Sequence, residues 1–140
     1  MILTDGEKMI LTPTYWVYDL YKPFQGATAL PVEVNSPAYT LGKASVPAVT
    51  ASAGRDAGGV IHLALVNLDP NRPATVTVKL SGVTGKAVEG RFLTAPTMAA
   101  HNTFAAPDVV KPAAFKGATL KGDTLTVVLP SKAVAVLDLR

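Results

Sequence analysis

The chain has 140 residues, of which 49% are hydrophobic and 16% charged, with a formal net charge of +3 and no cysteine. This length predicts one domain with a single core, and the hydrophobic fraction excludes an intrinsically disordered chain. The lack of cysteine excludes disulfides, thiolate metal sites and cysteine nucleophiles. Lysine and arginine are scattered singly rather than clustered, so we expect no nucleic-acid partner.

Residues 1–24 predict a short hairpin followed by one helix. Asp5 and Gly6 form a tight-turn signal between two short apolar runs. Thr12 suits a helix N-cap and Pro13 a first helical residue, and the helix should end before the next proline. The segment has no cationic start and no sustained apolar run, so we expect no signal peptide, no membrane partner and a cytoplasmic protein.

The predicted helix is apolar on nearly all sides, which is typical of a helix buried by more than one neighbour. Only Asp19 and Lys22 are charged within it. A single sandwich covers only one side, so we expect the rest to contact another domain or a second copy of the chain. The candidate residues of this interdomain or self-association surface are Tyr15, Trp16, Tyr18, Leu20, Tyr21 and Phe24.

From residue 25 onwards the pattern predicts strands, frequent turns and no second helix. After a linker, apolar alternation predicts strands over residues 30–35, 49–53, 87–94, 118–121, 124–129 and 133–139. Turns are expected at residues 56–59, 84–85 and 122–123, and residues 95–116 should be irregular. The fold class is therefore all-β, a β-sandwich or jelly roll of about eight strands preceded by one short N-terminal helix. Residues 1–24 and 25–140 form its two parts.

The strongest strand signal is a pair of runs at residues 60–68 and 75–80. The first is apolar on both faces except for His62 and Asn67, as expected of a central strand. In the second, apolar residues alternate with threonine and lysine. Asp69 suits a type I turn between the runs, so we expect an antiparallel pair at the centre of the sandwich.

The titratable residues show no catalytic or metal-binding pattern. His62 and His101 are far apart without clustered ligands, so we expect a structural role for His62, no metal and no cofactor. The glutamates Glu7, Glu33 and Glu89 give no sign of facing one another across a cleft. A nucleophile elbow and a phosphate-binding loop are also missing from the sequence, so no catalytic residue is assigned.

Carbohydrate-binding modules present aromatic side chains on a sheet face or at loop tips. Five of the nine aromatic residues belong to the predicted helix and its exit, which leaves the sheet faces nearly bare. Tyr39 and Phe104, in predicted loops, are the candidate glycan contacts. A stand-alone glycan-binding module is one alternative function, and a self-associating β-sandwich module is another.

Three stretches form a recognisable set. Residues 2–9 read ILTDGEKM and run into TPTY at 12–15, and residues 65–71 read LVNLDPN. Residues 100–112 spell His-Asn-Thr-Phe, then Pro-Asp, then Lys-Pro, a loop that composition alone does not explain. Together they resemble the C-terminal region of bacterial α-L-arabinofuranosidases of glycoside hydrolase family 51, over essentially the whole chain.

The resemblance implies a parent enzyme with a catalytic β/α barrel and a C-terminal jelly-roll sandwich. Such enzymes remove terminal arabinofuranosyl groups from arabinan and arabinoxylan with retention. The helix near the N-terminus would be the last helical piece of the barrel, with Trp16 where relatives commonly have histidine. Strands from the N-terminal end of the polypeptide complete the sandwich in this family.

The resemblance also implies that this chain does not catalyse hydrolysis. The family's two catalytic glutamates lie on barrel strands upstream, and the acid/base follows an asparagine; this chain contains no Asn-Glu pair. Retaining hydrolysis needs two carboxyl groups about 5 Å apart. We therefore expect a scaffolding domain whose partners are the catalytic barrel, further copies in a homo-oligomer, and arabinose-containing polysaccharide through the parent enzyme.

Overall fold

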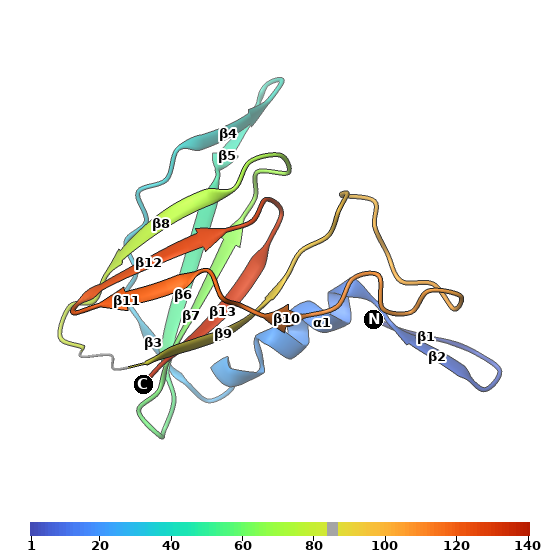
Figure 1. The fold of residues 1–140 in the computed structure, drawn as a ribbon, viewed down its shortest axis with the longest axis horizontal. Coiled ribbons are helices and arrows are strands. Elements are labelled where there is room, and N and C mark those ends of the chain that lie inside the picture. The colour runs from blue at the N-terminus through green and yellow to red at the C-terminus, as the bar shows by residue number, and fades with distance from the viewer. Residues whose placement is uncertain (84–86) are drawn as a thin grey trace.

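A computed structural model describes residues 1–83 and 87–140 of the chain (Figure 1). The larger of two facing sheets contains β3 (Thr28–Leu30), β6 (Val49–Arg55), β7 (Ile61–Asn67), β9 (Val88–Leu93), β10 (Ala113–Ala114) and β13 (Val134–Leu139). The smaller sheet contains β8 (Ala74–Lys79), β11 (Ala118–Lys121) and β12 (Thr124–Leu129). The strand orders are β10-β9-β13-β7-β6-β3 and β11-β12-β8. The predicted all-β sandwich is confirmed.

Two hairpins project from the sandwich (Figure 1). The first joins β1 (Ile2–Asp5) to β2 (Lys8–Leu11) and confirms the predicted N-terminal hairpin. The second joins β4 (Ala38–Leu41) to β5 (Ala44–Pro47) and was not predicted. Its turn contains Gly42, whose φ of 59° is readily adopted by glycine.

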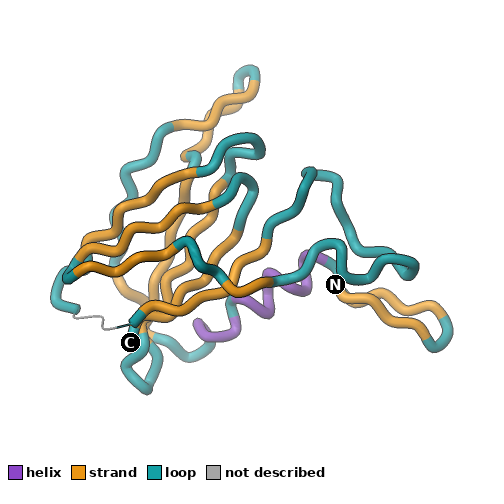
Figure 2. Tube along the Cα trace, viewed as in Figure 1, coloured by secondary structure: helices purple, strands orange, loops and turns teal. Residues whose placement is uncertain are grey.

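The helix α1 (Pro13–Leu20) lies along the outer face of the larger sheet (Figure 2). The predicted cap is confirmed, because the hydroxyl of Thr12 accepts a hydrogen bond from the backbone N–H of Tyr15 at 3.4 Å. The helix ends two residues earlier than expected and continues as a short 3₁₀ helix, η1 (Lys22–Phe24). The proline in η1 is tolerated because the first residues of a helix need no backbone donor.

Two apolar layers hold the molecule together. Between the sheets lie the inward-facing side chains of both, among them Leu65, Leu125 and Leu137, all at most 1% exposed. On the outer face of the larger sheet, Ala64 of β7 and Val136 of β13 pack against Leu20 of the helix. The helix therefore forms a third layer, which explains why β7 and β13 are apolar on both faces.

The predicted antiparallel pairing of residues 60–68 with 75–80 is wrong. Strand β7 lies between β6 and β13 in the larger sheet, whereas β8 pairs with β12 in the smaller one. The turn after β7 thus carries the chain from one sheet to the other. Its geometry is fixed by Asn67, whose side-chain amide donates to the carbonyls of Arg72 and Pro130, each at 2.9 Å.

Other expectations differ in detail from the structure. The strand predicted at residues 30–35 is wrong, since β3 ends before Pro31, and residues 31–37 form no regular element. Val32 and Val34 alternate with polar residues as in a strand, but both side chains are exposed. The hairpin of β11 and β12 is confirmed, as is the irregular excursion after β9, where β10 is the one short strand. The turn predicted at residues 84–85 lies outside the described residues.

Candidate functional site

The structure keeps the three glutamates apart. Glu7 lies in the turn of the first hairpin and Glu33 in the irregular segment before β4, both exposed. Glu89 lies on β9, where its carboxylate pairs with Arg140 at 3.3 Å. These carboxyl groups belong to separate elements and line no common pocket.

His62, the second residue of β7, is a titratable side chain that is only 5% exposed. Its Nδ1 lies 2.7 Å from a carboxylate oxygen of Asp138, and its Nε2 lies 3.2 Å from one of Asp56. Phe24 packs near the imidazole, with ring centroids 5.9 Å apart. Both ring nitrogens have partners, which confirms the prediction of a structural histidine. No group of three or more potential ligands in the described part of the chain could hold a metal ion.

Gly54 of β6 lies beside this arrangement. It stands opposite His62 in the register of β6 and β7, and a Cβ built on it would lie 3.4 Å from the ring of Phe24. The pKa of Asp56 is lowered although burial acts to raise it, because the N–H of Val60 and the imidazole stabilise its carboxylate. The cluster therefore joins a turn, a strand and the helix exit, and its groups satisfy one another.

The candidate surface on the helix is only partly accessible. Leu20 is 2% exposed inside the chain, so its assignment to an accessible surface is corrected: the outer face of the sheet already covers it. Trp16, Tyr21 and Phe24 pack in the same layer and are half-buried, and Tyr15 contacts the ring of Trp16 edge-on at 5.2 Å between centroids. Tyr18 is 66% exposed and points to solvent.

The described helices include none long and apolar enough to span a membrane.

The indole of Trp16 has a further property. Its N–H is buried and has no hydrogen-bond partner among the described residues.

The two candidate glycan contacts lie on different elements. Tyr39 is half-buried on β4, and Phe104 is exposed in the excursion at residues 94–112. The β4–β5 hairpin and the excursion leave the sandwich in different directions (Figure 1). The structure thus does not bring the two aromatic side chains together, and glycan contact by either residue stays a prediction.

The excursion contains a residue that sequence reasoning missed. Asn102 is 5% exposed, and its side-chain amide donates to the carbonyl of Leu11 at 2.7 Å and to that of Val110 at 2.9 Å. Its side-chain oxygen accepts from the N–H of Val110 at 2.7 Å. Asn102 therefore closes a loop upon itself and ties that loop to the end of β2. The His-Asn-Thr-Phe motif was the available signal, although it did not reveal the partners.

A groove of about 380 Å³ lies beside β8. It is bounded by residues 34–38 on one side and by residues 72–77 on the other. The buried polar side chains in its floor, Asn67 and Asp69, already bond to backbone groups of the turn after β7. The groove follows the edge of the sandwich and shows no cluster of unpaired polar groups.

Known proteins resemble this chain over its whole length. A family model described as the α-L-arabinofuranosidase C-terminal domain matches residues 1–132. An intracellular exo-α-L-arabinofuranosidase of Bacteroides ovatus is 38% identical over 141 residues, which cover 100% of this chain and 27% of that protein. The crystal structure of the GH51 arabinofuranosidase from Xanthomonas axonopodis pv. citri has a TM-score of 0.97 at 50% identity, covering 100% of this chain and 28% of that one.

A more distant structure shares the fold. The thermostable GH51 α-L-arabinofuranosidase from Thermotoga petrophila has a TM-score of 0.84 at 22% identity, covering 99% of this chain and 31% of that one. The chain thus spans less than a third of the length of these relatives. With the motif residues placed in structural roles and a family model matching nearly from end to end, the chain belongs to the α-L-arabinofuranosidase C-terminal domain family.

Proposed function

We propose that this chain is the supporting sandwich domain of a retaining α-L-arabinofuranosidase that removes terminal arabinofuranosyl groups from arabinan or arabinoxylan. In this proposal a catalytic barrel elsewhere in the enzyme carries both catalytic glutamates. The separated, exposed positions of Glu7, Glu33 and Glu89 support a chain that does not hydrolyse glycosides by itself. The relatives of more than three times its length support a role within a larger enzyme.

The unequal size of the two sheets is the observation that carries this proposal. A six-stranded sheet faces one of three strands, in which β8 is an edge strand of six residues without proline. Edge strands present unpaired N–H and C=O groups, which proteins usually cover or interrupt. The groove beside β8 supports an arrangement in which another segment of the polypeptide completes the smaller sheet.

The proposal extends to domain division, partners and compartment. Residues 1–24 would form the end of the barrel and residues 25–140 the sandwich, with the barrel as the direct partner of both. Arabinose-containing polysaccharide would reach the barrel, and the enzyme would form a homo-oligomer acting in L-arabinose metabolism. Scattered cationic residues support no role for nucleic acid, and no membrane partner is proposed. The word intracellular in the name of the Bacteroides relative supports a cytoplasmic location.

A domain graft tests the proposal. The graft is the Xanthomonas enzyme with its matching 28% replaced by this chain, a substitution justified by the TM-score of 0.97. We expect the graft to be soluble and to release p-nitrophenol from p-nitrophenyl α-L-arabinofuranoside at a rate within about tenfold of the parent enzyme. A graft that folds into two separate, inactive parts would contradict the proposal.

Self-association is the second candidate function, favoured by the open edge of β8. Two copies could pair along this edge and form a continuous sheet.

A glycan-binding role for Tyr39 or Phe104 is tested separately: retention of the chain on arabinoxylan beyond that of albumin would support it.

A further inference from the structure

We infer that the folded chain holds His62 as an imidazolium, clamped between Asp56 and Asp138, and that loss of its second proton releases the turn between β6 and β7. This inference concerns a proton-sensitive link within the sandwich and does not depend on the proposed function. We call the three side chains the histidine clamp. They come from the β6–β7 turn, from β7 and from β13.

The clamp places a carboxylate oxygen at each nitrogen of the imidazole ring. Nδ1 lies 2.7 Å from Asp138, and Nε2 lies 3.2 Å from Asp56. An ionised carboxylate only accepts hydrogen bonds, and a neutral imidazole donates from one nitrogen only. A neutral ring would therefore direct a lone pair at one of the carboxylates, although the imidazole is only 7% exposed. An imidazolium donates from both nitrogens and satisfies the geometry.

The partners of the ring favour its charged form. Burial acts to raise the pKa of Asp56, but the N–H of Val60 and the imidazole together lower it below its ordinary value. The proton shared with Asp56 therefore belongs to the ring. Asp138 is 30% exposed, so water solvates its carboxylate. The ring of Phe24, with its centroid 5.9 Å from that of the imidazole, attracts a cation at this distance.

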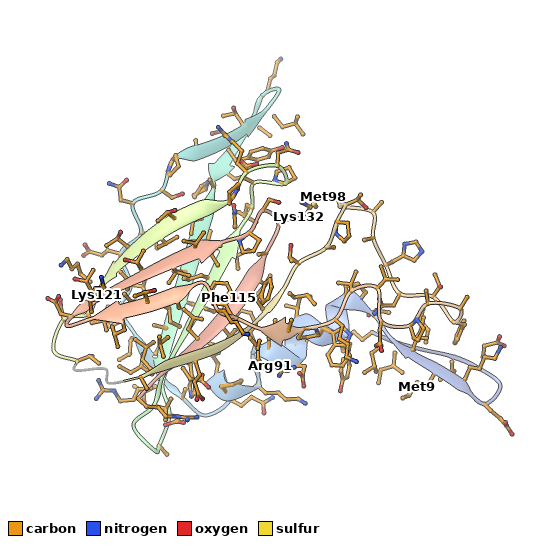
Figure 3. The ribbon with its side chains drawn as sticks, viewed as in Figure 1. Met9, Arg91, Met98, Phe115, Lys121 and Lys132 are labelled. Carbon is orange, nitrogen blue, oxygen red and sulfur yellow. The ribbon has the colours of Figure 1, made fainter. Side chains whose placement is uncertain are left out.

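The other charged groups near the clamp are paired with one another. Asp19, Glu89 and Arg91 line a cavity beside Asp138. Arg91 lies on β9 beside the helix (Figure 3), and its guanidinium pairs with Asp19 at 3.0 Å. The further pairs are Lys22 with Asp19 at 2.6 Å and Arg140 with Glu89 at 3.3 Å. Among the described residues, the imidazolium is thus the one cation paired with the carboxylates of the clamp.

The clamp fixes the turn between β6 and β7. Asp56 closes this turn, since its Oδ1 accepts from the N–H of Val60 at 2.9 Å and its own N–H donates to the carbonyl of Val60 at 3.0 Å. When the ring loses one proton to solvent, the remaining N–H stays at the shorter contact, which is to Asp138. The lone pair of Nε2 then faces the carboxylate of Asp56, so the turn separates from the strand.

NMR of the histidine rings tests the protonation of His62 directly. At pH 7.5, where imidazole in water is mostly neutral, we expect His62 to show two ring N–H protons that exchange slowly with water. His101 is exposed and is the internal control, which should show no slowly exchanging ring proton. A single ring N–H at His62, on either nitrogen, would overturn the inference.

Asp138→Asn is the matched variant. Its amide has nearly the size of the carboxyl group and can donate to Nδ1, so a neutral ring fits this variant. His62 should therefore show only one ring N–H at pH 7.5 in Asp138→Asn. Asp108→Asn removes an exposed carboxylate elsewhere and should leave both ring protons in place. Two ring protons in Asp138→Asn would show that the pair of carboxylates does not hold the charge, and would also overturn the inference.

Amide hydrogen exchange measures the release of the turn. The protection factor of the Val60 N–H, which corrects for faster chemical exchange at high pH, should fall about tenfold between pH 6 and pH 8.5. The N–H of Leu65, in the middle of β7, is the internal control and should keep its protection. An unchanged protection factor at Val60 would contradict the release.

Urea unfolding provides an independent measurement. The folded chain binds a proton that an unfolded chain gives up near pH 6.5 or about there, so its stability should fall as the pH rises from 6.5 to 8.5. The unfolding midpoint of wild type should fall over this range, and that of Asp138→Asn should fall less. A wild-type midpoint that rises, or an equal fall in the two proteins, would overturn the inference.

Discussion

At the scale of single residues, the sequence motifs shared with the family correspond to buried polar side chains that bind backbone. Asn67 donates hydrogen bonds to the turn after β7 and to the turn between β12 and β13. Asn102 ties the excursion to the β1–β2 hairpin. Such groups are costly to leave unpaired, so their partners restrict the backbone to one arrangement. The motifs thus specify architecture, and neither residue lies in a site with catalytic chemistry.

Replacing Asn102 by alanine should lower the free energy of unfolding by about 3 kcal/mol, because three backbone groups lose a buried partner. Asn102→Asp should cost less than the alanine variant only if the new carboxyl group is protonated and can donate. Urea unfolding measures both. His101→Ala is the control, since its exposed imidazole bonds only to the nearby carbonyl of Ala99; an equal loss in the control would contradict the role of Asn102.

Asp69 should make stability depend on acid pH. The backbone N–H of Asn71 donates to the Asp69 carboxylate and lowers its pKa. Burial acts to raise this pKa, and Arg72 lowers it further. A lowered folded pKa gives stability that is present above the ordinary carboxyl range of about 3.9 and is lost as pH falls through the folded value.

The variant Asp69→Asn removes that titration. The stability difference between wild type and Asp69→Asn should therefore be largest near pH 7 and shrink as the pH falls towards 3. Urea unfolding across this range measures it. Asp108→Asn, an exposed carboxylate paired with Lys111, is the control and should show a much smaller difference. A difference that grows on acidification would contradict the assignment.

At the scale of elements, local features were predictable and strand partners were not. The cap at Thr12, the turn at Gly122 and the strand at residues 133–139 each depend on neighbouring residues, and all are confirmed. The alternation of β8 shows that one face is buried, but it is equally compatible with pairing to β7 or to β12. Pairing depends on contacts distant in sequence, which a pattern within one strand does not encode.

Gly90 illustrates how the partner strand constrains an element. It faces Leu137 in the register of β9 and β13, where a Cβ would clash with the side chain of Leu137 and lie 2.9 Å from the carbonyl oxygen of Val136. Gly90→Ala should therefore destabilise the chain by about 2 kcal/mol in thermal or urea unfolding. Gly58→Ala, in an exposed turn where the nearest contact is the side chain of Asp56, is the matched control. Equal destabilisation by Gly90→Ala and Gly58→Ala would contradict the close packing of Gly90 against Leu137.

The same difference between local features and distant contacts applies to the candidate site residues. Sequence reasoning correctly predicted a structural His62, but its partner Asp138 lies 76 residues further on and was not identified. The sandwich was expected to cover only one side of the helix, and Leu20 was assigned to the open surface. The outer face of the larger sheet in fact buries Leu20. The third layer formed by helix and sheet was invisible because it joins segments more than forty residues apart.

At the scale of the whole molecule, the smaller sheet of the sandwich has an edge strand, β8, that is open to further pairing. The outer edge of β8 pairs with no other strand among the described residues. We therefore expect the chain to self-associate at high concentration, which sedimentation velocity can detect. A monomer at all concentrations would count against an open β8 edge in solution.

The central claim is that this domain supports an arabinofuranosidase without performing its chemistry. The most direct measurement compares turnover of p-nitrophenyl α-L-arabinofuranoside by the isolated chain and by the graft under identical conditions. The account predicts no turnover above the buffer rate for the chain and turnover close to that of the parent enzyme for the graft. Hydrolysis by the isolated chain that persists through purification, or a soluble graft without activity, would contradict it.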